Sequence, residues 1–590
     1  MDELPSALDP IQKEYLAGYV AGLASGKLLP FAGHLPDGRL SADPRSGAPN
    51  SVIEPPEETF FGTPLSELSK EERWKYEQNP LDIWEKIVAC ADSERPPEGA
   101  DVFRFKFFGL FYVAPAQDAF MLRVRIPGNV MSSHQLVGLA EMAREWGGGY
   151  GDITTRGNIQ LRELRPKHVV RVLMKLHDLG LIARGSGADN IRNITATPTS
   201  GFDPDELYDV RPLAQALQFY ILNHRDLYGL PRKFNVSFDS GGRVSVVADT
   251  NDIAFVARRI PAGRSVPEGV YFRVLLAGVT GHGDFARDAG IVVAPEECVA
   301  VAAAMIRVFN EHGDRTNRRK ARLKYLIDRW GVERFVDETQ KRLAFPLRRC
   351  DARECEPRPA VVRHGHLGVH PQRQRGLNYI GVAIPVGRMR ADEMRALAAI
   401  AQTYGTGLLC PTVWQNLIIP GIPDARLGAA TAAVVEAGFH YQASSIKGGM
   451  VACTGKSGCR FSATETKGHA LALTRYLEER IELDQPINIH ITGCPNSCAQ
   501  HYIGDIGLLG TTLTVGEQSL EAYNILVGGG TDDRQALARE LVKGVAFSDV
   551  PALLERILAT YRSRRVSDES FVDFVRRHRI DALRSLFGLS

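Results

Sequence analysis

The strongest constraint in this sequence is an internal repeat. When the chain is slid against itself by 258 residues, ten of the 33 positions in 126–158 are identical to those in 384–416, without a gap. At an offset of 253, KFNVSF from Lys233 lies over PINIHI from Pro486. A duplication of this length predicts two copies of one structural unit. We therefore expect two related halves that pack about a pseudo-twofold axis.

The repeat keeps its clustered thiols in the later copy only. Four of the nine cysteines fall within residues 453–498, and each aligns with a residue of the earlier copy that is not cysteine. The aligned pairs are Cys453 with Thr195, Cys459 with Gly201, Cys494 with Gly241 and Cys498 with Ser245. We therefore expect that only one copy, the later one, has kept these thiols for a chemical role. An interface between duplicated halves is a preferred place for a large cofactor.

Composition places the chain among globular proteins. Hydrophobic residues make up 44% and charged residues 24% of the 590 residues, and the net charge is +2. These values exclude a disordered or collagen-like chain and argue against a general nucleic-acid binder. No apolar run reaches the length of a membrane span, and the first residues lack a secretion signal. We expect a cytoplasmic monomer with no membrane contact.

Short strand-like runs alternate with helical stretches from Phe103 onward, as in FRFKFFGLFYV and then residues 135–146. This texture predicts an α+β or mixed α/β architecture. In the first hundred residues, Asp9 and Pro10 are expected to start one short helix, which a Pro- and Gly-rich stretch follows. This part is predicted to be an extension that packs onto a larger body.

The four clustered cysteines have the pattern of a metal site. ACTGKSGC holds Cys453 and Cys459, and TGCPNSCAQ holds Cys494 and Cys498. Nearby glycines let a loop approach a bound group closely and aim backbone N–H groups at sulfur. Four thiolates suit an iron–sulfur cluster or zinc. The spacing favours a cluster, because zinc pairs are usually two to four residues apart and the first pair here is wider.

The two cysteine motifs resemble those of the sirohaem-dependent nitrite and sulfite reductases. Four other segments resemble the same family: FMLRVRIPG, DITTRGNIQLRE, LPRKFNV and TVWQNLIIP. The resemblance covers most of the chain from about residue 60. It implies one 4Fe-4S cluster and one sirohaem. The cluster ligands would be Cys453, Cys459, Cys494 and Cys498, and Cys498 would also bridge to the sirohaem iron.

The resemblance also implies the fold, an internally duplicated α+β structure with pseudo-twofold symmetry. It contains two ferredoxin-like half-domains and two sirohaem/iron-sulfur-type α/β domains. The expected parts are an N-terminal extension (1–100), the first half-domain (101–180), the first α/β domain (181–345), a linker with the second half-domain (346–425) and the cluster-carrying α/β domain with the C-terminal tail (426–590).

A buried sirohaem needs fixed cations and amides for its carboxylates. If TTRGNIQLRE is a strand, its alternate residues point to one face, and those residues are Arg156, Asn158, Gln160 and Arg162. A solvated edge strand is the alternative interpretation of this pattern. The other residues expected to contact the cofactor are Arg125, Asn416, Asn496 and Cys498.

The resemblance places Arg123, Arg192, Lys233 and Asn235 on the open side of the sirohaem iron. Reduction of a bound oxyanion requires cations for the negative charge and proton donors for departing water. Nitrite is a monoanion and sulfite largely a dianion, so a neutral amide at Asn235 favours nitrite. Relatives resembling sulfite reductases tend to have a second lysine at this position.

We therefore expect a ferredoxin–nitrite reductase that reduces nitrite to ammonia. Sulfite reduction with the same cofactors is the alternative. A non-catalytic iron–sulfur or zinc protein is the alternative from another class. The sequence contains no nucleotide-binding fingerprint, so electrons must come from a separate carrier, and the resemblance implies a small acidic ferredoxin.

Two basic segments are candidate docking sites for this donor. They are residues 315–324 and the tail with Arg562, Arg564, Arg565, Arg576, Arg577 and Arg579. Solvated helix faces are the alternative for both. We expect His364, His366 and His370 to be loop residues rather than a metal triad, and the other five cysteines to be structural thiols.

Overall fold

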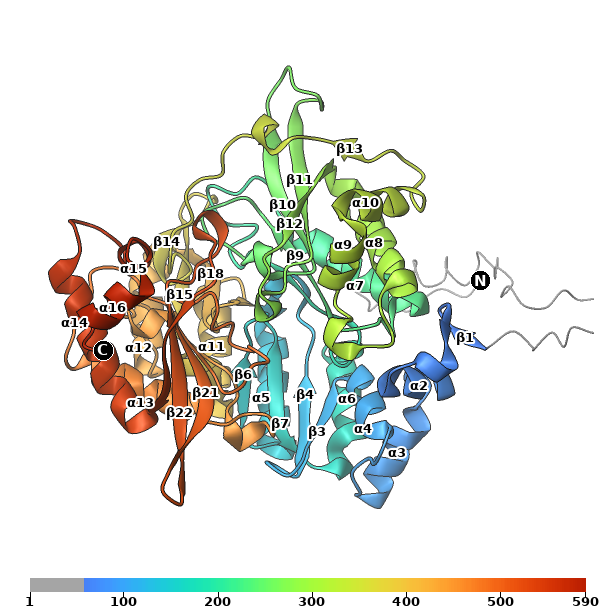
Figure 1. The fold of residues 1–590 in the computed structure, drawn as a ribbon, viewed down its shortest axis with the longest axis horizontal. Coiled ribbons are helices and arrows are strands. Elements are labelled where there is room, and N and C mark those ends of the chain that lie inside the picture. Colours follow the sequence, from blue (N-terminus) through green and yellow to red (C-terminus); the bar gives the residue numbers. More distant parts are fainter. Residues whose placement is uncertain (1–57, 590) are drawn as a thin grey trace, which may run out of the picture. The chain divides into compact units, whose positions relative to one another are not determined.

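The structure is a computed structural model, which describes residues 58–589. The helix predicted at Asp9 and Pro10 lies outside these residues. Two five-stranded sheets form the half-domains, and a six-stranded and a five-stranded sheet form the two larger domains (Figure 1). The predicted duplicated α+β architecture is confirmed.

The half-domains reproduce the repeat element by element. Helix α5 (Ser133–Trp146) and helix α11 (Ala391–Tyr404) both have 14 residues and start 258 residues apart. Helices α6 (Val169–Asp178) and α12 (Leu427–Glu436) have the same relation. The strands that are equivalent in the two copies are β3 (Leu110–Val113) and β14 (Gly368–Pro371), β4 (Ala119–Arg123) and β15 (Leu377–Val382), β6 (Tyr150–Ile153) and β17 (Leu408–Pro411), and β7 (Ile159–Leu164) and β18 (Leu417–Pro423).

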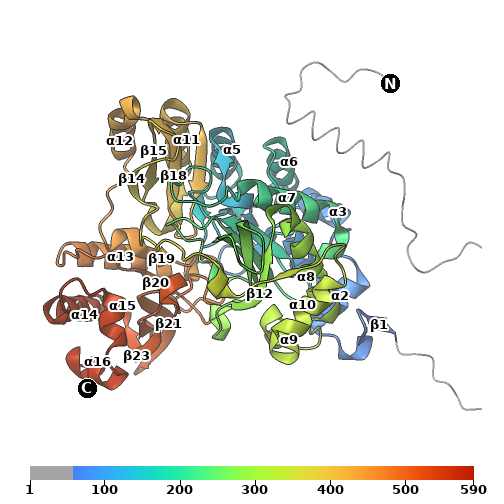
Figure 2. The ribbon, with the colours of Figure 1, turned by 90° about the horizontal axis from the view of Figure 1, so that it is seen from above.

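The two half-domains exchange one strand each. Strand β5 (Met131–Ser132) precedes α5 but pairs with β17, and β16 (Arg388–Arg390) precedes α11 but pairs with β6. A single apolar core contains residues of both copies, including Leu139 and Leu397 of α5 and α11. Figure 2 shows α12, α11, α5 and α6 along one edge of the view. The halves are therefore interlocked rather than merely in contact.

The two larger domains also share one plan. Each has three parallel strands followed by antiparallel ones, in the orders β8-β9-β10-β11-β12-β13 and β19-β20-β21-β22-β23. The first set is Ile191–Ala196, Phe234–Asp239, Ile253–Ile260, Gly269–Leu276, Arg287–Val293 and Arg348–Arg349. The second set is Met450–Ala452, Ile489–Thr492, Ile506–Val515, Gln518–Val527 and Arg539–Ala546. The helices are α7 (Arg211–Asn223), α8 (Cys298–His312), α9 (Leu323–Trp330) and α10 (Val332–Gln340), then α13 (Thr466–Glu478), α14 (Val550–Arg564), α15 (Phe571–Arg576) and α16 (Ile580–Leu586).

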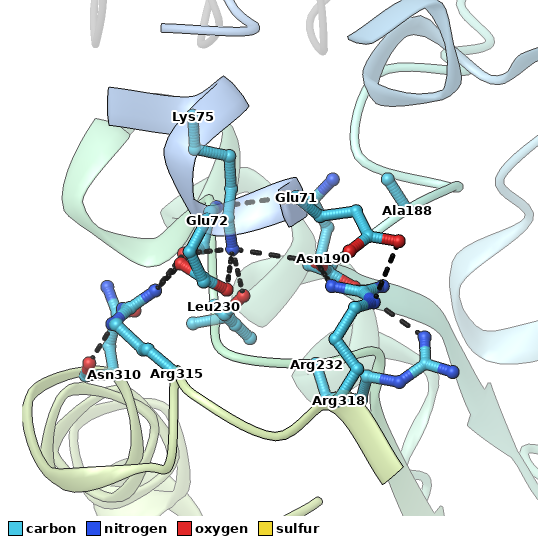
Figure 3. Close-up of polar contacts among 12 residues, drawn as sticks. Glu71, Glu72, Lys75, Ala188, Asn190, Leu230, Arg232, Asn310, Arg315 and Arg318 are labelled. Carbon is cyan, nitrogen blue, oxygen red and sulfur yellow. Dashed lines mark hydrogen bonds and ion pairs between the residues drawn. The ribbon is translucent and has the colours of Figure 1, made fainter. Parts of the chain in front are cut away.

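Residues 58–104 carry a short hairpin and three helices, which lie beside the first copy. They are β1 (Thr59–Phe60), β2 (Thr63–Pro64), α2 (Lys70–Glu77), α3 (Trp84–Ser93) and α4 (Asp101–Arg104). Lys75 and Glu72 of α2 are buried, and Lys75 donates to the carbonyl of Leu230 at 2.8 Å. Arg315 pairs with the same Glu72 at 2.5 Å (Figure 3). Buried charges of this kind are stable only when paired, so this network fixes α2 to the first copy.

No helix among residues 58–589 is both long enough and apolar enough to cross a bilayer.

Candidate active site

The four clustered cysteines follow two neighbouring parallel strands. Cys453 comes directly after β19, and Cys494 comes two residues after β20. Parallel strands end at the same edge of a sheet, so the two loops meet there. Burial, and then the nearby thiols of Cys498, Cys459 and Cys453, raise the pKa of Cys494 to about 11. The structure therefore brings the four predicted ligands together.

Backbone groups in these loops are directed at sulfur. The N–H of Gly493 donates to Sγ of Cys453 at 3.3 Å, and the hydroxyl of Thr466 donates to the carbonyl of the same cysteine at 2.7 Å. A Cβ at Gly493 would lie 1.8 Å from Oγ of Ser462. Only glycine fits there, and N–H groups aimed at thiolates are a means by which proteins tune iron–sulfur clusters.

Among residues 58–589, no three His, Cys, Asp or Glu side chains converge on a point where one metal ion could sit. Cys453, Cys459, Cys494 and Cys498 are all free thiols on this pair of loops. Four thiolates are the usual ligands of a four-iron cluster, so this donor set fits one.

Opposite the thiols lies a group of cations from the first copy. It consists of Arg123 at the end of β4, Arg156 in the turn after β6, Arg192 in β8, Lys233 just before β9, and Arg322. We call these five residues the cation group. Burial, and then Arg322, lower the pKa of Lys233 to about 7. Burial lowers the pKa values of Arg123 and Arg156 to about 10.

The cations are close enough to repel one another. Arg123 lowers the pKa of Arg192, and Arg192 and Arg156 lower that of Lys233. The Nε of Arg192 is buried and has no hydrogen-bond partner. Arg123, Arg156, Arg192 and Lys233 are half-buried and form no salt bridge among the described residues. Clustered, partly desolvated cations and orphaned donors are costly, so this group has the chemistry of a site for a large polyanion. Sirohaem, with its many carboxylates, fits that requirement.

Cys498 connects the cation group to the cysteine loops. It is exposed, and an ionised sulfur at this position would raise the pKa values of Arg123, Arg156 and Lys233. The hydroxyl of Thr155, next to Arg156, donates to the carbonyl of Cys498 at 3.0 Å. The last cysteine thus faces the cations across the boundary between the copies.

Arg322 is a site residue that sequence reasoning assigned elsewhere. Its guanidinium is 4% exposed and pairs with Asp252 at 2.7 Å. The same carboxylate accepts the backbone N–H of Asn235 at 2.9 Å. Arg322 therefore points inward, beside the predicted substrate residues. The sequence signal nearest to Arg322 is its partner Asp252, which aligns with Asp505 at the 253-residue offset.

The side chains of three residues that were expected to contact the cofactor form hydrogen bonds with backbone groups. Arg125 is 1% exposed and donates to the carbonyls of Ile191 and Arg192, both at 3.0 Å. Asn158 donates to the carbonyl of Val124 at 3.0 Å. In the other copy, Asn416 accepts the N–H of Ile384 at 3.0 Å and contacts His366. All three therefore help to hold backbone turns, and their contact with a cofactor stays a prediction.

The predicted alternation along TTRGNIQLRE is only partly correct. Strand β7 begins at Ile159, because Gly157 has a φ of +58° and closes a turn before it. Gln160 and Arg162 lie on the strand, whereas Arg156 and Asn158 lie in the turn. Arg162 donates to Oγ1 of Thr454 at 2.6 Å, so it contacts the cysteine loop. Asn496 is exposed, and its backbone N–H lowers the pKa of Cys494.

The prediction that residues 315–324 form a docking surface is wrong for most of their cations. Arg315 is buried against Glu72, and Arg318 pairs with Asp189 at 2.7 Å and with Glu71 at 3.2 Å (Figure 3). In the tail, Arg565 pairs with Asp484 and Arg577 with Glu569, while Arg562, Arg564 and Arg579 are exposed. A run of basic letters does not reveal which charges are already paired.

The three linker histidines have separate partners. His364 contacts Oδ1 of Asn488 at 2.8 Å, His366 contacts Asn416 at 2.9 Å, and His370 contacts the carbonyl of Leu367 at 2.6 Å. Burial lowers the pKa of His364 to about 4, so its ring is neutral at ordinary pH. His364 and His366 lie in the turn before β14, as expected, whereas His370 lies on β14 itself, so the loop prediction is wrong for His370.

The pseudo-twofold mate of the cation group is a cavity of about 380 Å³. Its lining includes Ser245, Arg363, His366, Trp414, Pro486 and Asn488, and we call it the mate pocket. By the repeat offsets, Trp414 stands where the first copy has Arg156, Pro486 where it has Lys233, and Ser245 where the later copy has Cys498. The mate pocket therefore keeps Arg363 but lacks equivalents of Arg156, Lys233 and the Cys498 thiol.

Together these features define a duplicated α+β protein whose later copy carries four clustered cysteines beside a group of cations from the first copy. The model of the nitrite and sulphite reductase 4Fe-4S domain matches residues 187–347 and 447–588. The model of the nitrite/sulfite reductase ferredoxin-like half domain matches residues 114–179 and 370–437. The chain belongs to the nitrite and sulfite reductase family, and an iron–sulfur cluster is part of that assignment.

Relatives and solved structures agree with this placement. The chain is 36% identical to a ferredoxin–nitrite reductase of Synechococcus elongatus, over 83% of this chain and 96% of that one. It is 30% identical to an assimilatory ferredoxin-dependent nitrite reductase of Haloferax mediterranei, over 87% and 92%. The NirA protein of Mycobacterium tuberculosis superposes with a TM-score of 0.81 at 28% identity, over 88% and 98%.

Proposed function

We propose that this chain reduces nitrite to ammonia in a six-electron reaction, using reduced ferredoxin, at a sirohaem coupled to a 4Fe-4S cluster. The observation that carries the proposal is the cation group, in which Arg322 is the only member with a salt bridge among the described residues, and in which Arg123, Arg156 and Lys233 lie near Cys498. The names of the relatives, which are ferredoxin–nitrite reductases, supply the reaction and the donor. We keep the monomeric state and the cytoplasmic location as parts of the proposal.

When bound, sirohaem would supply the metal that receives the substrate and the electrons that reduce it. The residues of this chain have other tasks. Arg123 and Arg192 would hold the oxygens of the anion, because a guanidinium is always charged and offers paired donors. Lys233, with a pKa near 7, can release a proton to a departing oxygen and be recharged from solvent. Cys498 would connect the two cofactors.

Asn235 supports nitrite over sulfite. Its side chain is 3% exposed, and its amide adds no charge to the cation group. A lysine there would add a buried cation that a dianion satisfies better than a monoanion. Sulfite reduction remains the second candidate because it uses the same cofactors and scaffold.

The electron donor would approach beside Cys459. Lys456 and Arg460 are exposed there, and the guanidinium of Arg460 lies 4.8 Å from the ring centre of Phe461. Phe461 is itself 59% exposed. An exposed aromatic residue between cations is suited to an acidic protein partner. This surface is next to a predicted cluster ligand, so electrons delivered there would travel a short distance.

One experiment tests the proposal. The purified holoenzyme is analysed anaerobically for iron, acid-labile sulfide and its visible spectrum, and then assayed with nitrite and with sulfite. We expect four cluster irons plus one sirohaem iron per chain and a higher kcat/KM for nitrite. An equal or higher value for sulfite would establish the second candidate instead. A protein with zinc and no macrocycle would exclude both.

A further inference from the structure

Beneath the cysteine loops lies a buried ion network with more positive than negative charge. Asp152 of β6 is 3% exposed. It accepts from Nε of Arg162 at 3.1 Å and from Nε of Arg388 at 2.8 Å, and Nζ of Lys467 lies 3.4 Å away. One carboxylate therefore meets three cations. We call these four residues the Asp152 network.

Each cation of the Asp152 network comes from a different part of the fold. Arg162 belongs to β7 of the first half-domain, and Arg388 to β16, the strand that the second half-domain contributes to the first sheet. Lys467 lies in the first turn of α13. Asp152 thus sits where both half-domains and the cluster-carrying domain meet.

Two members of the network hold the cysteine loop directly or through one neighbour. Arg162 donates to Oγ1 of Thr454 at 2.6 Å and to the carbonyl of Gly458 at 3.3 Å, and these residues adjoin Cys453 and Cys459. Thr466, next to Lys467, donates to the carbonyl of Cys453 at 2.7 Å. The network is therefore within bonding contact of the segment that carries two of the four thiols.

The other groups around Asp152 do not remove the charge surplus. Gln160 accepts from Arg162 through its neutral amide at 2.8 Å. Tyr150 lies under Arg388, with the guanidinium 4.1 Å from its ring centre, and donates to Glu163. Glu465 acts on Arg388 more weakly than Asp152 does. Burial raises the pKa of Asp152, but Lys467, Arg388 and Arg162 together hold it well below its usual range.

We propose that the Asp152 network raises the reduction potential of the cluster as well as positioning its loop. A four-iron cluster with four thiolates is a dianion when oxidised and gains one further negative charge when it accepts an electron. Buried positive charge stabilises the reduced state more than the oxidised one, and net charge near a cluster is a known determinant of its potential. This inference rests on the cluster part of the proposed function and not on the substrate.

Two substitutions shift the charge in opposite directions. Asp152→Asn removes the only carboxylate and increases the surplus, so the potential is expected to rise. Lys467→Gln removes one cation but keeps a donor toward the carbonyl of Val386, which Lys467 contacts, so the potential is expected to fall. Lys467→Arg keeps the charge and is the matched control. Its potential should stay close to that of the wild type.

The measurement is a potentiometric titration of each holoenzyme, followed by the electron paramagnetic resonance signal of the reduced cluster, without nitrite or ferredoxin. Opposite shifts in the first two variants support the proposal. Shifts of the same sign, as simple loosening of the loop would give, or no shifts, overturn it.

Arg388→Gln provides a second route if Asp152→Asn prevents cluster assembly. Arg388 is about one-third exposed, so its replacement disturbs the fold less, and a smaller fall in potential is expected. An unchanged or raised potential in this variant contradicts the proposal. Because no substrate is present, a failure of nitrite reduction would leave these potentials measurable and the two failures separable.

Discussion

The cation group and the mate pocket are two copies of one place in the fold, and only one of them holds the predicted substrate residues. Both keep a buried carboxylate that pairs with an arginine and accepts a backbone N–H. Beside the cation group, the carboxylate is that of Asp252, the arginine is Arg322 and the N–H is that of Asn235. At the mate pocket, the equivalents are Asp505, Arg363 and Asn488. The scaffold is therefore the same, and the difference must lie in the side chains added to it.

That difference is charge and sulfur. The mate pocket has Trp414, Pro486 and Ser245 where the equivalent positions hold Arg156, Lys233 and Cys498. An aromatic ring, a proline and a hydroxyl cannot bind a polyanion or connect it to a cluster. The comparison shows that the two cavities share one backbone plan and differ in a few side chains.

The largest expected effect comes from giving Cys498 the hydroxyl that its counterpart Ser245 has. Cys498→Ser should lower nitrite reduction by about a thousandfold or more, because the thiolate that joins the two cofactors is lost. Activity with a viologen donor and iron content are the measurements. Cys355→Ser is the control, since Cys355 lies outside the site, and it should leave activity unchanged. Retained activity in Cys498→Ser would contradict the assigned connection.

The next effect comes from Lys233, whose counterpart is Pro486. Lys233→Gln should lower kcat/KM for nitrite by about a hundredfold, as for loss of one preorganised donor in a buried site. The variant Lys320→Gln removes an exposed lysine and should have no effect. A loss below threefold in Lys233→Gln would remove this residue from the mechanism.

The same lysine predicts a pH dependence. Its lowered pKa of about 7 means that Lys233 loses its charge as the pH rises through that value, and the cofactor's carboxylates move this point upward. The kcat/KM for nitrite should therefore decline on the alkaline side of neutrality. Lys233→Arg, which stays charged, should flatten that decline. An identical alkaline limb in both enzymes would show that another group is responsible.

Substrate preference distinguishes the two places more finely. Asn235→Lys should raise the ratio of sulfite to nitrite kcat/KM by about tenfold, because the added cation favours a dianion. The equivalent change in the mate pocket, Asn488→Lys, should leave the ratio as it was. Steady-state kinetics with both substrates give the answer. Equal changes in both variants would mean that the preference arises from overall charge.

The smallest effect is expected at the surface. Lys456→Glu with Arg460→Glu should raise the KM for ferredoxin by about fivefold at low salt and leave viologen-driven activity unchanged. Arg562→Glu with Arg564→Glu in the exposed tail is the matched control. A larger effect in the tail pair would instead support the C-terminal segment, one of the two candidates that the sequence suggested.

Much of the fold could be predicted because the repeat was legible in the sequence. The conserved spacing of α5 and α11 appears as a single offset of 258 residues. The cysteine loops could also be predicted, since thiols with that spacing among glycines have few other uses. The exchange of β5 and β16 could not, because these strands are too short to show a pattern.

Side-chain direction set the limit at the site. Arg125 lies two residues from Arg123, yet it is buried with its guanidinium on backbone carbonyls, whereas Arg123 donates to the carbonyl of Ser186 and also lies beside Arg192 of the cation group. The turn at Gly157 likewise separates Asn158 from Gln160. Arg322 was hidden in a run of basic residues. Tertiary contacts decide whether each of these side chains is already paired, and a single sequence does not show such contacts locally.

The exchanged strands have a consequence for how the molecule is made. A ribosome releases Met131 and Ser132 long before their partner, Leu408 and Leu409, exists. The first sheet in turn must wait for Met389 to complete its edge. Neither half can mature ahead of the other, so the anion site and the cysteine loops are assembled in one late event. Two separately expressed fragments would need to be mixed before either could accept a cofactor.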